Sequence, residues 1–285
     1  MIEFTINKGG NLEVFHRDLP PTVFLDHWAW RKISESESST KRFSSALKSR
    51  KGTLVLSWLN LIEFSKVTDE QQTCKADALL NEILPQIFFI NPNFFKVIEH
   101  ENELLAGSEA ITPHADTELL KGFAKLNLLK SNSLKLLPAQ NIFRLVPATG
   151  IAGQYDHFAD LIISYIESLR RDYDNDKEFR LRVNRLPKGR QNQYGTRFIA
   201  NELFGSFLKN KQIKVSRNHA IDVSHAVVAV AYCDYVLLDG HWATQVEQAK
   251  KRIIDGGLSV PMAKVFSEKN DGIERFLQEI EFGGK

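Results

Sequence analysis

The sequence predicts an α/β protein with a three-layer fold, in which helices flank a central parallel sheet, plus a helical insertion. Short apolar runs of strand length alternate with segments of helical periodicity in the first hundred residues and again near the C-terminus. Between these parts, residues 112–211 have helical patterns without a convincing strand. We therefore predict an α/β core formed by residues 1–111 and 212–285, with residues 112–211 as a helical insertion packed on it.

The composition of the 285 residues is ordinary for a globular protein, and the chain is long enough to bury a substantial core. The formal net charge is only +2, so overall charge does not indicate a nucleic-acid partner. Cys74 and Cys233 lie far apart, which argues against a disulfide framework or a zinc site and fits a reducing compartment. The N-terminus lacks signal-peptide features, and no apolar run approaches the ~20 residues that span a bilayer. We expect a cytoplasmic protein without a membrane partner.

The first half of the core contains three predicted strands, at residues 22–25, 53–56 and 86–90. Helices are predicted after Asp26, from residue 57 onward, at residues 68–84, where a capping sequence begins the helix, and at residues 94–106. Residues 34–51 are polar and contain five basic side chains, which is typical of a solvated helix face or a loop.

Helices are predicted in the insertion at residues 116–126, 155–185 and 191–209. Basic residues occur there without an intervening acidic residue, interleaved with amide and aromatic side chains: Arg180, Arg182, Arg185, Lys188, Arg190 and Arg197. This pattern is typical of phosphate and nucleic-acid contacts. A solvated basic helix face has the same pattern, so both interpretations stay open.

The second half of the core begins with an apolar run after Asp222 that contains neither charge nor helix breaker over residues 226–233, as in a buried helix. Residues 235–238 form a short predicted strand that ends at Asp239, and Asp239-Gly240 is also a turn signal. An amphipathic helix at residues 242–253, a strand at residues 263–266 and a helix at residues 272–280 complete the chain.

Acidic residues occur where a parallel sheet would bring them together. Asp26 follows the first strand, Glu63 lies beyond the second, and Asp222 and Asp239 flank the late strand. Ligands of open parallel sheets bind outside the carboxyl ends of the strands. Glu63 has apolar neighbours, so it needs either a basic partner or a metal ion shared with Asp26. Clustered carboxylates are stable mainly around hard cations, which indicates Mg²⁺ or Mn²⁺ rather than zinc.

These acids lie in three motifs: Val-Phe-Leu-Asp26, Leu-Val-Leu-Ser-x-x-Asn-Leu-Ile-Glu63 and Asp222-x-x-His-Ala-x-x-Ala-x-x-Tyr-Cys-Asp-Tyr-x-Leu-x-Asp239. The motifs resemble those of PIN-domain and PIN-like nucleases over about residues 20–106 and 212–282. The resemblance implies a PIN-like fold whose Asp26, Glu63, Asp222 and Asp239 bind Mg²⁺ or Mn²⁺ and cut RNA, or in some branches DNA. Leu238 departs from the family, which often has Thr or Ser there as a further ligand or water contact.

Two further residues of the last motif have alternative roles. Asp234 is either a fifth acid facing the metal or, as we favour, a local cap or ion-pair partner. His225 lies one helical turn after Asp222 and is either an ordinary core residue or a group that hydrogen-bonds toward the site. We assign His225 a supporting position behind the metal ligands.

We therefore predict a metal-dependent nuclease that hydrolyses phosphodiester bonds, with RNA favoured over DNA by the resemblance. The alternative is a catalytically silent PIN-like module that binds nucleic acid or protein. A phosphatase or another phosphoryl-transfer enzyme ranks last, since no Walker-type loop is present and no Asp-x-Asp follows the first strand. PIN-like nucleases include toxins of toxin–antitoxin systems, defence proteins and RNA-processing enzymes. A regulatory protein partner and the oligomeric state stay open.

Overall fold

The computed structural model describes residues 2–6, 12–84, 86–122, 143, 150–188, 195–210 and 212–283, with side chains from His16 onward. Its centre is a five-stranded parallel sheet with the strand order β5-β4-β3-β6-β7. The strands are β3 (Thr22–Leu25), β4 (Thr53–Leu56), β5 (Ile87–Phe89), β6 (Tyr235–Leu237) and β7 (Lys264–Phe266). The predicted α/β class and all five predicted strands are confirmed.

The central strand β3 is buried along its whole length, as are its neighbour β4 and the edge strand β5. Such continuous apolar runs are typical of parallel strands covered on both faces. Leu25 on β3 pairs with Leu237 on β6, so these two strands end at the same level of the sheet. The residues that follow them, Asp26 and Leu238-Asp239, therefore leave the sheet side by side.

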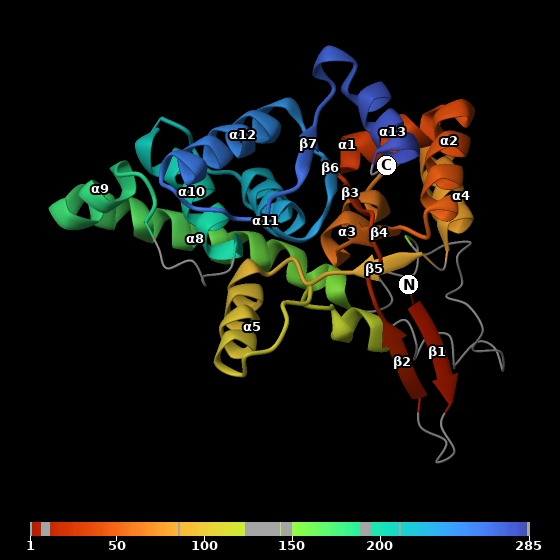
Figure 1. The fold of residues 1–285 in the computed structure, drawn as a ribbon, viewed down its shortest axis with the longest axis horizontal. Coiled ribbons are helices and arrows are strands. Elements are labelled where there is room, and N and C mark those ends of the chain that lie inside the picture. The colour runs from red at the N-terminus through yellow and green to blue at the C-terminus, as the bar shows by residue number, and fades with distance from the viewer. Residues whose placement is uncertain are drawn as a thin grey trace.

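Helices cover both faces of the sheet (Figure 1). One layer contains α1 (His27–Glu35), α2 (Glu37–Ser49), α4 (Glu70–Ile83) and α13 (Gly272–Phe282), which contact one another. The other contains α11 (Arg217–Tyr232) and α12 (Gly240–Asp255), while α3 (Trp58–Ser65) follows β4 and α5 (Phe94–Ala106) follows β5. The short helix η4 (Lys269–Asp271) precedes α13. The molecule is thus a three-layer α/β structure.

The basic, polar residues 34–51 form the end of α1 and all of α2, in agreement with a solvated helix face. Phe43 and Leu47 of α2 are buried, whereas its cationic side chains lie outside the core. Arg42 pairs with Glu274 and Glu281 of α13, at 2.7 Å in each case. These ion pairs link two helices of the same layer.

The insertion contributes η3 (Ile151–Gly153), α8 (Gln154–Asn175), α9 (Lys177–Asn184) and α10 (Gly195–Lys209). The prediction of one helix over residues 155–185 is wrong, because Asp176 adopts an extended backbone and caps α9 by accepting from the amides of Glu178 and Phe179. Of the predicted helix at residues 116–126, residues 117–122 are helical and Asp116 precedes them, accepting from the Leu119 amide. Residues 123–126, and residues 191–194 of the third predicted helix, lie outside the described residues.

The helices α8 and α10 pack on the α/β core through aromatic contacts and through an ion pair whose side chains are mostly buried. The ring of Phe204 lies 5.2 Å from that of Phe94 on α5, and Phe207 lies 5.9 Å from Trp242 on α12. Arg252 of α12 also binds Glu202 of α10 at 2.5 Å. The insertion therefore forms a continuous layer with α11 and α12, as Figure 1 shows.

An antiparallel hairpin that was not predicted, β1 (Ile2–Ile6) and β2 (Leu12–His16), precedes the sheet. His16 attaches it to the edge strand β5. Its Nε2 accepts a hydrogen bond from the Phe89 amide at 2.9 Å, and its ring stacks on Phe88 at 4.0 Å. Burial lowers the pKa of His16 to about 3, which keeps the imidazole neutral and able to accept this bond.

Within the described ranges, none of the helices combines the length and the apolar character that crossing a membrane requires.

Gly52 allows a close approach between the start of β4 and the cis peptide Pro20-Pro21 before β3. A Cβ atom at Gly52 would lie 2.6 Å from the Pro21 carbonyl oxygen and 2.8 Å from Leu47 Cδ1. We expect Gly52→Ala to lower the free energy of unfolding by about 1–3 kcal/mol through overpacking. Gly153→Ala is the control, since a Cβ there meets no atom within 4 Å. Urea denaturation compares the two variants, and equal stability would contradict the expected steric conflict.

Candidate metal centre

Asp26 and Asp239 each end a strand and begin a helix. Asp26 Oδ1 accepts from the His27 amide at 2.8 Å, which caps α1, and Asp239 Oδ1 accepts from the amides of His241 and Trp242, both at 2.8 Å, which caps α12. The Asp26 amide donates to the Leu237 carbonyl at 3.0 Å, and the Asp239 amide donates to the Asp26 carboxylate. Asp239 thus caps a helix and also lies beside Asp26.

Glu63 and Asp222 approach this pair from two helices. Glu63 lies on α3, which follows β4, and Asp222 lies on α11. Burial raises the pKa of Glu63 well above its usual range, and the charges of Asp26 and Asp222 raise it further. Burial likewise raises the pKa of Asp222 to about 7, with Asp26 and Asp239 adding to the shift. The four predicted acids therefore lie close enough to interact at the carboxyl edge of the sheet.

Asp26 accepts two backbone hydrogen bonds, as Asp239 does. Burial raises the pKa of Asp26 to about 6, hydrogen bonds from the backbone of His27 and Asp239 oppose this rise, and the Asp239 charge adds to it. The Trp242 indole donates a hydrogen bond to Asp222. Hydrogen-bond donors at fixed positions hold the carboxylates in place but do not cancel their mutual repulsion.

Three side chains present ligand atoms that lie close enough together to hold a cation. One oxygen from Asp26, one from Glu63 and one ring nitrogen of His225 lie within 4.8 Å of one another. Glu63 Oε2 and His225 Nδ1 are buried and have no hydrogen-bond partner in the part of the chain that the structure describes. Unpaired buried polar atoms are costly. A cation held between them would satisfy both atoms.

His225 lies beside Asp26 and Glu63, where its ring is within reach of the same ion. Its ring is among the groups that could contact the ion. The sequence signal was weak, because a single His among Ala and Val residues has the same pattern as a core residue. Its contact with Ser57, 168 residues earlier in the chain, is what reveals its orientation.

Tyr155 of the insertion and Lys66 lie beside the acids. Tyr155, at the start of α8, is buried, and its pKa is raised by this burial and by the charges of Glu63 and Asp222. Lys66, which follows α3, lies with Nζ 3.5 Å from the centroid of the Tyr155 ring, and its charge lowers the pKa of Glu63. Neither residue was predicted as part of the site, since nothing in their local sequence distinguishes them from other surface and core residues.

Asp234 does not belong to this centre, and the prediction that it could be a fifth metal-facing acid is wrong. It precedes β6, at the amino end of the sheet, whereas the other acids lie at the carboxyl end. Its Oδ2 accepts from the Thr22 amide at 2.7 Å and from Thr22 Oγ1 at 3.0 Å. Asp234 instead ties the start of β6 to the start of β3, which is a long-range contact and not the local cap or ion pair that the sequence analysis favoured.

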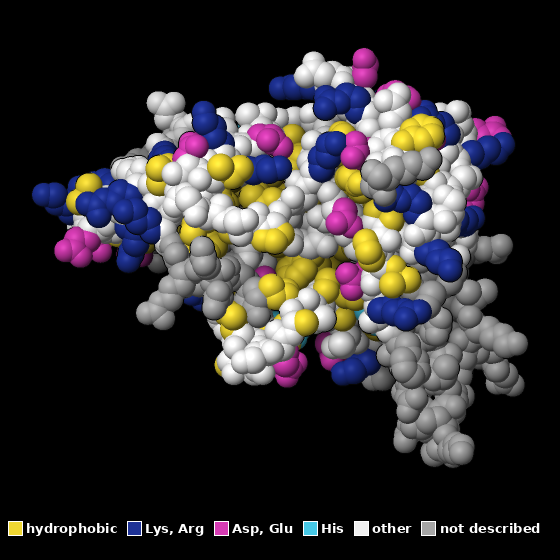
Figure 2. Space-filling model, viewed as in Figure 1, with side chains coloured by type: hydrophobic (Ala, Val, Ile, Leu, Met, Phe, Trp, Pro, Cys, Tyr) yellow, Lys and Arg dark blue, Asp and Glu magenta, His cyan; other side chains and the backbone are white. Residues whose placement is uncertain are grey.

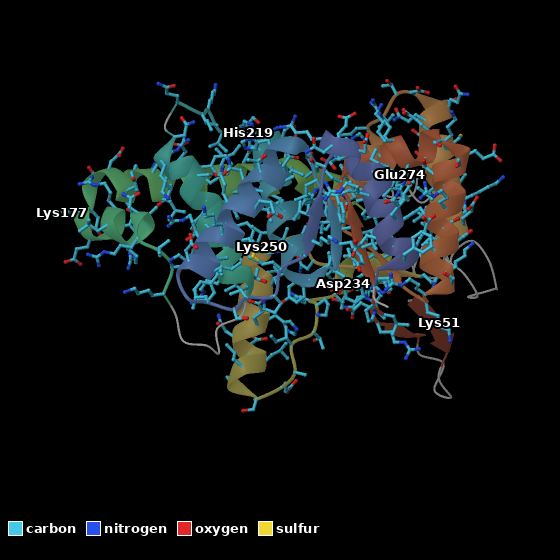
Figure 3. The ribbon with its side chains drawn as sticks, turned by 45° about the horizontal axis from the view of Figure 1, so that its top comes forward. Lys51, Lys177, His219, Asp234, Lys250 and Glu274 are labelled. Carbon is cyan, nitrogen blue, oxygen red and sulfur yellow. The ribbon has the colours of Figure 1, made fainter. Side chains whose placement is uncertain are left out.

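The predicted basic residues lie away from the acids. In Figures 1 and 3, α9, marked by Lys177, forms one end of the long axis, while the strands and Asp234 lie toward the other. Figure 2 shows Lys and Arg side chains gathered at that end. Arg182, Arg185 and Lys188 line an open cavity of about 880 Å³ between α8, α9 and α10. Arg180 caps α8 by donating to the carbonyls of Tyr173 and Asp174.

Arg197 and Arg190 are the two other residues of the predicted basic segment. Arg197 is exposed on α10, and its charge lowers the pKa of the buried Glu101. Arg190 lies outside the described residues. The basic segment is therefore a feature of the helical insertion, separate from the carboxylates at the sheet edge.

Replacing Asp234 separates its structural role from metal binding. We expect Asp234→Ala to lower the free energy of unfolding by about 1–2 kcal/mol, because the Thr22 amide and hydroxyl lose an ionised acceptor. Mn²⁺ affinity measured by calorimetry should stay unchanged. A loss of Mn²⁺ binding by the folded variant would contradict the assignment.

Repulsion between the acids predicts a pH-dependent cost in the metal-free protein. The pKa of Asp222 is raised from 3.8 to about 7 in the folded chain. The unfolded chain therefore releases this proton first as the pH rises, so the free energy of unfolding falls between about pH 4 and 7. We expect Asp222→Asn to gain stability relative to the parent chain across this window, on the order of 2 kcal/mol. Denaturant unfolding at several pH values in chelator measures the difference.

Asp222→Asn has to be compared with the parent protein at each pH, because His16 and His225 change the free energy of unfolding with pH in the opposite direction. Burial lowers the pKa of each to about 3, so both destabilise the fold as the pH falls. A difference between Asp222→Asn and the parent chain that stays constant from pH 4 to pH 8 would show that Asp222 does not titrate in this way.

Comparisons with protein-family models, with curated proteins and with solved structures give no match for this chain. The resemblance to PIN-like nucleases therefore rests on the three motifs alone. The structure shows an α/β chain with a cluster of carboxylates at the carboxyl edge of its parallel sheet.

Proposed function

We propose that the protein is a metal-dependent nuclease with a PIN-like core, in which Asp26, Glu63, Asp222 and Asp239 bind Mg²⁺ or Mn²⁺. The observation that carries the proposal is the convergence of these carboxylates from separate elements, together with the unpaired buried oxygen of Glu63. Half-buried acids that lie this close together and only stabilised the fold would be expected to have basic partners. RNA is the favoured substrate because of the motif resemblance.

The donor set fits the proposed ion. Carboxylate oxygens are the preferred ligands of hard divalent cations. Asp26 and Asp239 are held by their helix caps, so their carboxylates are already positioned before any ion binds. A bound divalent cation would supply an activated water and would offset charge on a phosphoryl group.

Side chains around the acids suit a phosphate ester. Lys66 is exposed beside Glu63 and could contact a non-bridging phosphate oxygen. The Tyr155 ring lies near Glu63 and Asp222, and the centroid of the Trp58 ring is 6.5 Å from that of Tyr155. The basic side chains of α9 would form a second contact with the phosphates of the same ligand. A ligand that reached both places would have to be a polymer, which favours a nucleic acid over a small phosphate ester.

Substituting single acids tests the proposal. We expect Asp26→Asn and Asp239→Asn each to reduce Mn²⁺-dependent cleavage by about 100-fold or more, since the amide keeps the helix cap but removes the charge. The assay uses labelled single- and double-stranded RNA and DNA, with Mn²⁺ or with chelator. Asp255→Asn is the matched control, because Asp255 is exposed at the end of α12.

Two results would overturn the nuclease proposal. Cleavage that persists undiminished in both variants would exclude the acids from the reaction. A parent chain that binds neither Mg²⁺ nor Mn²⁺ in calorimetry would instead favour the catalytically silent module, whose binding to the same nucleic acids would then be measured directly.

A further inference from the structure

We propose that His225 is itself a metal ligand, through Nδ1, and that this nitrogen makes the centre prefer a first-row transition-metal ion such as Mn²⁺ over Mg²⁺. The inference rests on the proposed metal centre and goes beyond its four acids. It is carried by the position of the ring, by the hydrogen bonds that fix its protonated nitrogen, and by the unpaired nitrogen that remains.

The ring of His225 is enclosed in the core at the carboxyl edge of the sheet. The residue is only 2% exposed and lies one turn after Asp222 on α11. Its ring centroid is 5.4 Å from that of Phe24 on β3, the strand that leads to Asp26. Asp26, Glu63 and His225 together form the group whose ligand atoms lie within 4.8 Å of one another.

Hydrogen bonds around Ser57 determine which nitrogen of His225 carries the proton. Ser57 Oγ donates to Asn60 Oδ1 at 3.1 Å, and this uses its single hydroxyl proton. With the hydroxyl proton assigned to Asn60 Oδ1, the 3.0 Å contact between Ser57 Oγ and His225 Nε2 has the ring nitrogen as donor. In the neutral imidazole the proton therefore lies on Nε2, and Nδ1 presents a lone pair.

That lone pair has no protein partner. Nδ1 is buried without a hydrogen bond among the described residues, and so is Oε2 of Glu63 in the same group. A donor N–H or a cation would satisfy each of them. A cation bound by Asp26, Glu63 and His225 would satisfy both atoms at once and would also compensate the charge of Glu63.

A nitrogen ligand changes which ion the centre holds best. Mg²⁺ favours an all-oxygen, octahedral shell and keeps several waters. Imidazole is a good ligand for first-row transition-metal ions. The helix cap formed by Ser57 and Asn60 holds the ring in place, as the outer hydrogen bonds of metal-bound histidines commonly do.

Pulsed electron paramagnetic resonance of Mn²⁺ tests the ligand directly on the unaltered full chain. The protein is stripped with chelator, loaded with Mn²⁺, and compared with protein grown on ¹⁵N-histidine. We expect a directly coordinated histidine nitrogen, seen as a ¹⁴N coupling that changes with the label. The coupling should disappear in His225→Gln, whose amide keeps the contact to Ser57 but has no group at the Nδ1 position.

Calorimetry with Mn²⁺ and Mg²⁺ tests the preference. His225→Gln should weaken Mn²⁺ binding about 10- to 100-fold and should change Mg²⁺ binding much less. His225→Asn places an amide at the Nδ1 position, so it should retain binding but reduce the ratio of Mn²⁺ to Mg²⁺ affinity. Circular dichroism checks that each variant is folded, and the Asn variant serves if the Gln variant is not.

The outcomes separate this inference from the proposed function. Bound Mn²⁺ without a histidine coupling, or an unchanged affinity ratio in both folded variants, would overturn the role of His225 and leave the acidic centre standing. Failure of the parent chain to bind either ion would overturn both. A histidine coupling that persists in His225→Gln would assign the ligand to another histidine and would also overturn the inference.

Discussion

The structure depends on one electrostatic constraint, which is the placement of several carboxylates at a buried edge where they repel one another. The neighbouring elements are arranged to reduce this cost. Helix starts supply amides to Asp26 and Asp239, and the Trp242 indole donates to Asp222. Glu63 has the least support, since its Oε2 has no hydrogen-bond partner within the described residues. The repulsion between these acids is consequently a cost to folding, as expected where binding takes precedence over stability.

The two parts of the chain contribute differently to this edge. The α/β core supplies the acids, because β3, β4 and β6 are neighbours and end together. The insertion supplies Tyr155, which lies near Glu63 and Asp222, and a separate group of basic side chains at α9. This division allows the charge-bearing chemistry to stay on rigid elements while the insertion defines what can approach it. It also places the cavity beside α9, which Arg182, Arg185 and Lys188 line, away from the acids.

Much of this arrangement could be predicted from local sequence. Buried parallel strands have continuous apolar runs, and an acid directly after such a run, like Asp26 or Asp239, is recognisable. Asp234 was harder, because it differs from Asp239 only in preceding the strand rather than following it. The orientation of His225 depends on Ser57 and Asn60 from a distant segment, and no local pattern reports such a contact. The break at Asp176 was missed because a capping Asp can also lie within a helix.

The capping role of Asp26 and Asp239 has a consequence for substitutions at these two positions. An Asp-to-Asn exchange at either position retains an oxygen that can cap the helix, yet it removes one charge from a mutually repelling set. Such an exchange would therefore relieve part of the repulsion and leave the helix caps in place. The acids at these two positions are thus not required for the caps, because Asn would serve there equally well.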